Sequence, residues 1–414
     1  MRMGPWRTGP GPRWMTRLAL VALLGTGSAT ALASTTSASA AGAAGAAATT
    51  QWTASQAVLP IGPLPDGGTP VSIEITATSC TSSFCMAVGN VGDNRAGFPL
   101  AEVYESGQWT PSVLPLPSSA SGQVIGGRLT AVSCAADGSC GAAGVDILAS
   151  GATYALLEHL SAGKWTATTG PLPPGHPFGA VLAMNAVSCS DSAQCVAVGD
   201  TNGFSGGDAG VIYTFNGSTW RYQRAPSFGF DGVTQLNGVS CLASRCVAVG
   251  DYLDLSSHSH ALILSGQGTF WSMQHVPALP ESGTAAWLNT VDCPAQNACV
   301  AVGGLIGGKV VGEQGLTLYQ QGGTWRGLVN GTALTLTNEL NGVSCPTVGT
   351  CIATQISYGP ESGAVLNGSN ASWSDQATPW APGGVSCGTI DFCMIPLQPE
   401  FSLDGQVEVG GLSG

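Results

Sequence analysis

The sequence has few charged residues and very few basic ones. Only 9% of its 414 residues are charged, and 12 Lys and Arg stand against 24 Asp and Glu, which gives a net charge of −12. Because phosphate binding needs a stripe of Lys and Arg, this composition argues against nucleic acid as a partner. The acidic excess is typical of a solubilising surface, with a cationic ligand as the alternative.

Long apolar runs are also scarce. Residues 18–24 form a short one, which follows four arginines and precedes small residues suited to cleavage at 31–33 or at 38–40. A run of this length cannot span a bilayer, and the pattern is typical of a secretory signal peptide. No later stretch is long and apolar enough to predict a membrane span.

These features predict three parts. We expect a signal peptide at 1–33, a flexible lead-in rich in Ala, Ser and Thr at 34–50, and a single domain at 51–414. No linker or charge run divides the last part. The sequence thus predicts a secreted, extracellular protein, expected to be monomeric and to need no cofactor.

Cysteine is abundant and regularly placed. All 14 cysteines form close pairs with four or five residues between them, and successive pairs begin 42 to 55 residues apart. In an exported chain such pairs predict local disulfides. Zinc ligation is the alternative, but it combines two pairs per ion, which pairs spread around a ring cannot supply. The pairs are Cys80 with Cys85, Cys134 with Cys140, Cys189 with Cys195, Cys241 with Cys246, Cys293 with Cys299, Cys345 with Cys351 and Cys387 with Cys393.

Each repeat reads as four short strands. In the fourth repeat these are 235–241, 246–250, 260–265 and 270–276, all rich in aliphatic or aromatic residues and bounded by Gly, Pro, Ser or Asp. Four strands in about 50 residues fit a β-propeller blade. A tryptophan follows a Gly-rich turn in six repeats, where we expect it in the blade core: Trp109, Trp165, Trp220, Trp271, Trp325 and Trp373.

The two ends of the chain complement each other. The seventh cysteine pair is followed by a strand-like segment at 401–409 but by no tryptophan, whereas residues 51–59 resemble the fourth strand at 108–114. We therefore predict an all-β fold, a seven-bladed β-propeller with four antiparallel strands per blade. Its ring is closed by the N-terminal strand, which completes the last blade and leaves no free edge there.

Five aspartates follow the second strand of the first four repeats. We predict them in the loops between the second and third strands, on a variable face opposite the cysteine hairpins. Because calcium binds six to eight oxygens from such loops, they are candidates for a cation or polyol site; capping of a turn is the alternative. The candidates are Asp93, Asp146, Asp200, Asp251 and Asp254.

Two other features fall outside the strand pattern. Trp287 and Trp380 lie away from the repeated tryptophan position, so either could stack on a sugar, with core filling as the alternative. His258 and His260 lie two positions apart in the longest loop between a second and a third strand. They could share one face and hold a metal, or they could simply belong to a polar loop.

A recurrent polar residue lies four positions before the first cysteine. It is Asn185, Asn237, Asn289 and Asn341 in four repeats, and Thr76 and Thr130 in the first two. Since a ligand seldom contacts four blades in the same way, we expect these side chains to form hydrogen bonds between blades. A site at the mouth of the central channel is the alternative.

The repeat consists of VSC, four or five further residues, CVAVGD and then G-x-W. It resembles those of secreted actinobacterial seven-bladed propeller proteins. Its last turn is similar to the Asp-box hairpin of sialidase-type propellers, S-x-D-x-G-x-T-W. The turns at 216–220 and 321–325 keep the glycine and tryptophan and lack the aspartate. The resemblance implies the fold but not the activity, since no motif frames the arginine triad, tyrosine nucleophile and acid of a sialidase.

No catalytic set is evident at a convincing spacing. We therefore expect a secreted, non-catalytic binding or interaction module, located at the cell wall or outside the cell. Its partner would be a protein or carbohydrate ligand on the variable face. A glycan-cleaving, sialidase-like propeller enzyme is the alternative.

Overall fold

The computed structural model describes most of the domain. The described residues are 50–93, 97–118, 122–171, 181–202, 209–226, 233–279, 285–307, 313–329, 338–356, 363–369, 372–378, 382–397 and 406–412. They belong to one compact unit, Ala48–Gly414. The predicted signal peptide and nearly all of the predicted lead-in lie outside this part of the chain. Within it, every regular element is a strand, and no helix is long and apolar enough to cross a membrane.

The strands form seven four-stranded sheets, numbered here as blades 1 to 7. Blade 1 contains β2 (Ser72–Cys80), β3 (Cys85–Gly92), β4 (Gly97–Glu105) and β5 (Gln108–Val113). Blade 2 contains β6 (Val124–Cys134), β7 (Cys140–Leu148), β8 (Thr153–Ser161) and β9 (Lys164–Thr169). Blade 3 contains β10 (Val181–Asp191), β11 (Gln194–Asn202), β12 (Ala209–Phe215) and β13 (Trp220–Arg224).

The remaining blades follow the same plan. Blade 4 contains β14 (Thr234–Leu242), β15 (Arg245–Leu253), β16 (Ser259–Gln267) and β17 (Phe270–Met273). Blade 5 contains β18 (Ala285–Asp292), β19 (Val300–Ile306), β20 (Glu313–Gln321) and β21 (Thr324–Val329). Blade 6 contains β22 (Leu340–Thr347), β23 (Thr350–Ile356), β24 (Gly363–Ser369) and β25 (Ser372–Thr378). Blade 7 contains β26 (Ser386–Thr389), β27 (Phe392–Pro396), β28 (Gln406–Leu412) and β1 (Thr50–Gln56).

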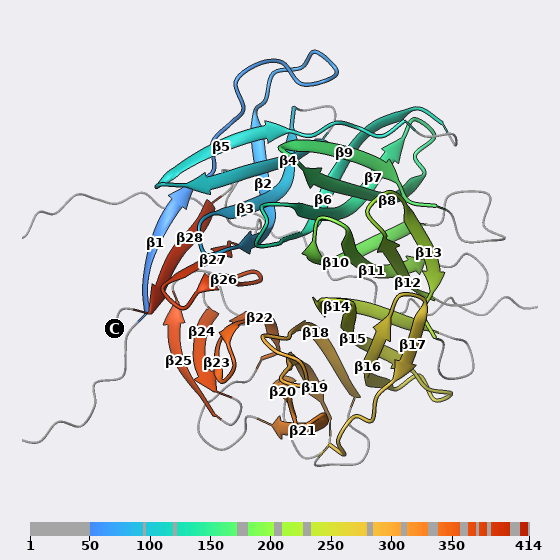
Figure 1. The fold of residues 1–414 in the computed structure, drawn as a ribbon, viewed down its shortest axis with the longest axis vertical. Helices are drawn as coiled ribbons and strands as arrows, with labels where there is room; N and C mark the ends of the chain where they lie inside the picture. The colour runs from blue at the N-terminus through green and yellow to red at the C-terminus, as the bar shows by residue number, and fades with distance from the viewer. Residues whose placement is uncertain are drawn as a thin grey trace, which may run out of the picture. The chain divides into compact units, whose positions relative to one another are not determined.

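Blade 7 joins the two ends of the domain. Its strand order is β26, β27, β28 and then β1, and β1 pairs with β28 in antiparallel register from Thr50 opposite Leu412 to Gln56 opposite Gln406. In Figure 1 the blue strand β1 lies along the red strand β28. The predicted all-β propeller with four-stranded antiparallel blades is confirmed, as is the pairing of the N-terminal strand with the last sheet.

The apolar core is divided among the interfaces between blades. Each sheet is covered on both faces by the neighbouring sheets, so the second strand of a blade is buried on both sides. In β3, for example, seven of the eight residues are buried. One cluster joins Leu157 of blade 2 to Tyr213 of blade 3, and another joins Ile263 of blade 4 to Leu316 of blade 5. The repeated tryptophans belong to such clusters, as predicted.

All seven predicted disulfides are present, and the described part of the chain contains no free cysteine. Each closes the hairpin between the first and second strands of one blade, and in blade 4 Cys241 lies directly opposite Cys246. The turn between the third and fourth strands lies at the same end of a blade, because consecutive strands run antiparallel. We call this end of the blades the hairpin face. Disulfides of this kind are typical of an oxidising, extracellular environment.

A ring of hydrogen bonds links every blade to the next. The residue before the first cysteine of one blade accepts a bond from the backbone N–H of the first cysteine of the following blade; it is serine in six blades and Asp292 in blade 5. The bonds run from Cys80 to Ser386 (2.9 Å), Cys134 to Ser79 (2.9 Å), Cys189 to Ser133 (3.0 Å), Cys241 to Ser188 (2.9 Å), Cys293 to Ser240 (3.1 Å), Cys345 to Asp292 (2.6 Å) and Cys387 to Ser344 (3.0 Å). Since Ser386 belongs to blade 7 and Cys80 to blade 1, this ring is closed.

The recurrent Asn and Thr residues were predicted to bond between blades, and five of the six do so. Each is the extra residue of a β-bulge in the first strand, which leaves it out of the ladder and turns it toward the neighbouring blade. Five of them donate to a main-chain carbonyl of the next first strand: Thr76 to Leu129 (2.7 Å), Thr130 to Met184, Asn185 to Leu236 (2.9 Å), Asn237 to Leu288 (2.9 Å) and Asn289 to Leu340 (2.9 Å). These bonds fix the stagger between adjacent blades.

Candidate functional site

A pocket of about 570 Å³ opens on the hairpin face between blades 4 and 5. Blade 4 contributes its cysteine hairpin, from Ser240 to Val247, and the turn around Gln267. Blade 5 contributes its own cysteine hairpin around Gln296 and the turn that contains Gln320. The volume lies within the range of roughly 300–1,000 Å³ that is usual for sites that bind small molecules.

This interface lacks two rings that fill the equivalent space between blades 2 and 3. At the interface between blades 2 and 3, His159 packs against Phe215 with ring centroids 4.5 Å apart. By strand register, Ser265 of blade 4 takes the place of His159, and Gln320 of blade 5 takes the place of Phe215. Both rings are thus replaced by smaller or polar side chains, and the interface stays open where the equivalent one is filled.

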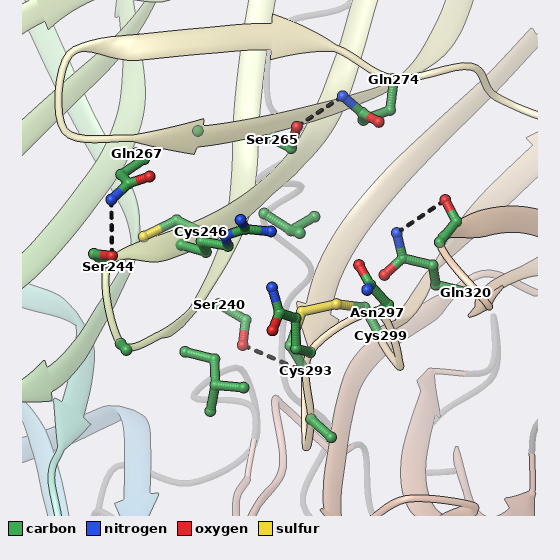
Figure 2. Close-up of a pocket in the computed structure, with 18 of the residues that line it drawn as sticks. Ser240, Ser244, Cys246, Ser265, Gln267, Gln274, Cys293, Asn297, Cys299 and Gln320 are labelled. Atoms are coloured by element: carbon green, nitrogen blue, oxygen red, sulfur yellow. Dashed lines mark hydrogen bonds between the residues drawn. A yellow bond between two sulfur atoms is a disulfide. The ribbon is translucent and has the colours of Figure 1, made fainter.

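Hydroxyl and amide groups from both blades line the pocket (Figure 2). Gln267 donates from Nε2 to Ser244 Oγ at 3.0 Å, and Gln274 donates from Nε2 to Ser265 Oγ at 2.7 Å. Each serine oxygen therefore accepts one bond, and its own O–H has no partner among the described residues. Because hydroxyls and amides both donate and accept, this lining suits a neutral, hydroxyl-rich ligand.

Three residues of the pocket depart from the repeat, and all three belong to blade 4. Leu242 follows the first cysteine, where the other blades have Thr, Ala, Ser, Pro or Gly. Arg245 precedes the second cysteine, where no other blade has a charged residue, and Phe270 precedes the repeated tryptophan, where no other blade has an aromatic one. Leu242 is 43% exposed and Phe270 83% exposed. Apolar side chains exposed together beside a pocket are typical of a binding surface.

Arg245 is the one charged residue among the described residues that line the pocket. Among the residues that the structure describes it forms no ion pair within 4.0 Å. No described Asp, Glu, His or Tyr lines the pocket either, so its described lining lacks the usual general acids and bases. The arrangement can bind and orient a ligand.

The predicted positions of three aspartates were wrong. Asp146, Asp200 and Asp251 lie within the second strands β7, β11 and β15, not in the following loops. Each carboxylate has a partner in its own blade: Asp146 accepts from Thr169 Oγ1 at 2.7 Å, Asp200 from Asn185 Nδ2 at 2.8 Å and Asp251 from Ser259 Oγ at 2.7 Å. Burial raises the pKa of Asp146 to about 6 and also raises the pKa of Asp251.

Asp93 and Asp254 do follow their strands. Asp254 accepts from His260 Nε2 at 2.9 Å and from the backbone N–H groups of Ser256 and His258 at 2.8 and 3.0 Å. These bonds, the one from His260 first, lower the pKa of Asp254 to about 2. Asp254 is thus a turn cap for its own loop. In the described ranges no group of three or more His, Cys, Asp or Glu could hold a metal ion, and whether any of the five aspartates binds a ligand stays a prediction.

Trp287 is a part-buried residue of β18. Its indole N–H donates to Glu339 Oε2 at 2.6 Å, and a side chain at Gly304 would collide with its ring. Glu339 also accepts from Asn289 Nδ2 at 3.3 Å. Trp287 therefore supports the contact between blades 5 and 6, and a role in stacking on a sugar stays a prediction. Trp380, like most loops of the predicted variable face, lies outside the described residues.

Sequence reasoning missed the pocket and two of its main residues. Arg245 was not among the predicted site residues, and Phe270 was predicted only as the first residue of the strand at 270–276. The available signal was the comparison of repeats, since no other blade has a charged residue at the position of Arg245 or an aromatic one at the position of Phe270. The residues that recur in the repeat form the interfaces between blades.

The comparisons with known proteins identify the fold. The chain matches no protein-family model and no curated protein sequence. Solved structures of similar fold include YCF48 bound to D1 peptide (15% identity, TM-score 0.50, 87% of this chain and 95% of that chain). A second is a PL25 ulvan lyase bound to -[GlcA(1-4)Rha3S]- (11% identity, TM-score 0.52, 84% of this chain and 94% of that chain). A third is the β-propeller domain of the Trilobed protease from Pyrococcus furiosus (8% identity, TM-score 0.52, 83% of this chain and 97% of that chain). At these identities the similarity establishes a β-propeller and nothing about activity.

Proposed function

We propose that this protein is an exported, seven-bladed, non-catalytic propeller that binds a saccharide in the pocket between blades 4 and 5. The observation that carries the proposal is the lining of that pocket. It combines hydroxyl and amide groups, an exposed aromatic ring and no acid–base group among the described residues. Export is supported by the seven disulfides and by the predicted signal peptide.

The rigidity of the site supports binding. The two cysteine hairpins that form its rim are each closed by a disulfide, Cys241–Cys246 and Cys293–Cys299, and Ser240 Oγ joins them by accepting from the backbone N–H of Cys293 at 3.1 Å. A rim fixed in this way loses little conformational entropy when a ligand binds, so more of the contact energy appears as affinity.

The similar structures agree with a ligand of this kind without selecting it. YCF48 is described as bound to a peptide and the ulvan lyase as bound to a saccharide, so the propeller fold carries sites for either class. A sialidase-like glycan-cleaving activity, the alternative considered from the sequence, would need a tyrosine nucleophile and an acid near the ligand. The described lining of this pocket has no tyrosine and no carboxylate.

Filling the pocket tests the proposal. Ser265→Tyr places in blade 4 the residue that blade 5 has at the equivalent position, Tyr319, and the ring would occupy the open interface. Thr110→Tyr adds the same ring to an exposed position of the outer strand β5 and serves as control. We expect calorimetric titration to show that the wild-type protein and the control bind oligosaccharides such as maltotriose or trigalacturonate and that Ser265→Tyr does not. Equal binding by all three proteins would place the ligand elsewhere.

A further inference from the structure

We infer that the ligand is an anionic saccharide, whose carboxylate or sulfate pairs with Arg245 while its pyranose ring packs on Phe270. This inference rests on the proposed function, because it names the ligand class of the same pocket. It follows from three properties of the blade 4 side: the isolated charge, the exposed ring and the arrangement of hydrogen-bonding groups.

The charge comes first. Arg245 is the first residue of β15 and lies opposite Leu242 across a two-residue turn, directly beside the disulfide Cys241–Cys246. The backbone that bears the guanidinium is thus fixed by the hairpin and by the bridge. A guanidinium presents a planar fork of donors that matches carboxylate and sulfate oxygens two at a time.

The surroundings of Arg245 favour pairing with an anionic group of a ligand. The chain as a whole has a net charge of −12, and a cation on such a protein would usually have acidic neighbours. No described Asp or Glu lines this pocket, and Arg245 has no ion pair within the described ranges. An anionic group on the ligand would therefore complete the pair.

The exposed ring supplies the apolar contact. Phe270 begins β17 and is 83% exposed, so most of its ring surface is available for contact with a ligand. The C–H groups on one side of a pyranose ring form a flat apolar patch, which gains dispersion contacts when it packs on an aromatic face. Leu242, 43% exposed, extends this apolar surface at the pocket rim.

The polar groups match sugar hydroxyls. Gln267 and Gln274 hold Ser244 and Ser265, as described above, which aligns the serine O–H groups as donors and leaves the glutamine carbonyl oxygens as acceptors. In Figure 2 the Gln267–Ser244 pair lies at the left and the Gln274–Ser265 pair at the top, while Asn297 and Gln320 lie at the right. A peptide would instead call for backbone partners, such as a free strand edge, and the lining offers chiefly side-chain groups.

Charge selectivity tests the inference. Trigalacturonate and its uncharged counterpart, α-1,4-linked galactotriose, differ in the carboxylates alone, and a sulfated chondroitin tetrasaccharide tests sulfate. We expect the wild-type protein to bind at least one of the anionic saccharides 10-fold or more tightly than galactotriose, with an affinity that falls as salt increases. Preference for either anionic probe supports the inference and identifies the anionic group.

Two variants separate the contributions of Arg245 and Phe270. Arg245→Gln should lower the affinity for the anionic saccharide to that for galactotriose and abolish the salt dependence, whereas Arg326→Gln removes the same charge from the exposed outer strand of blade 5 and should change nothing. Phe270→Ala should weaken the binding of charged and neutral saccharides by a similar factor.

The possible failures are distinguishable. If galactotriose binds as tightly as trigalacturonate and the sulfated tetrasaccharide, or if Arg245→Gln has no effect, the anionic ligand is excluded while saccharide binding stands. If triglutamate binds more tightly than every saccharide, the inference is overturned in favour of an acidic peptide. If no saccharide binds, the proposed function fails as well.

Discussion

A buried carboxyl group in blade 2 allows a quantitative test of the packing between blades. Glu158 lies in the middle of β8, flanked in register by Ala142 on β7 and Ala167 on β9, and its side chain is fully buried. Neither carboxyl oxygen has a hydrogen-bond partner in the described part of the chain. Burial without a partner raises the pKa of Glu158 from 4.5 to about 8.

The sign of the pH dependence follows from this pKa. Below pH 4.5 the group is protonated in both the folded and the unfolded chain and contributes no difference. Between 4.5 and about 8 the unfolded chain releases a proton that the folded chain retains, so the free energy of unfolding falls as pH rises. Since one pKa unit corresponds to 1.36 kcal/mol, the loss reaches about 4 kcal/mol at pH 8.

The repeat indicates the substitution that removes this loss. At the same position in strand register, blades 4, 5 and 6 have Leu264, Leu318 and Leu366. Glu158→Leu should therefore fit the interface and raise the free energy of unfolding at pH 8 by about 4 kcal/mol from the charge alone, but by only about 1 kcal/mol at pH 5. Any gain from apolar packing adds equally at both pH values.

Urea unfolding of the oxidised protein at pH 5 and pH 8 measures both differences. Glu105→Leu, at the exposed end of β4, is the control and should show no such pH-dependent gain. The reasoning would be refuted if Glu158→Leu changed the free energy of unfolding by the same amount at both pH values. That result would mean that Glu158 is ionised in the folded protein.

Three further predictions concern the interfaces and loops. Asn237→Ala removes a hydrogen bond between blades and should lower the free energy of unfolding by about 1–3 kcal/mol. Asn341→Ala is the control and should lower it less, because Asn341 Nδ2 has no partner among the described residues. Equal losses in urea unfolding would argue against the bond. Hydrogen bonds lower the pKa of Asp254 from 3.8 to about 2. The stability that these bonds add to the folded protein is therefore present above pH 3.8 and is lost as pH falls through 2. An NMR titration midpoint near 4 would contradict the role of Asp254 as a cap. Replacing Cys80 and Cys85 together by alanine should lower the free energy of unfolding by about 2 kcal/mol, and an unchanged urea midpoint would show that this bridge does not limit stability.

The sequence predicted the scaffold well because its determinants are local. Each blade carries its own strand pattern, cysteine pair and tryptophan, so one repeat could be understood without knowledge of the others. The closure by β1 was predictable because residues 51–59 resemble the outer strand of blade 1. The sequence predicted that the recurrent Asn and Thr residues form hydrogen bonds between blades. It did not predict which carbonyl accepts each bond, since that group belongs to the next blade.

The misplaced aspartates have a physical explanation in the bulges. In the repeated VGD, glycine was interpreted as the end of a strand, and aspartate as the start of a loop. Gly250 is instead an interior residue of β15, opposite Leu236 and beside the bulge at Asn237. A side chain at Gly250 would collide with the carbonyl oxygen of Gln235. Glycine is required there for close packing, so β15 continues through Asp251.

The contrast between repeated and unrepeated residues also explains where a ligand can bind. A ring of equivalent blades needs the same contacts at every interface, which the serine, asparagine and tryptophan positions provide. Those side chains are occupied by neighbouring blades and are not available to a ligand. A specific site must therefore come from residues that break the repeat. Leu242, Arg245 and Phe270 break it in one blade, and they line the pocket at the interface between blades 4 and 5.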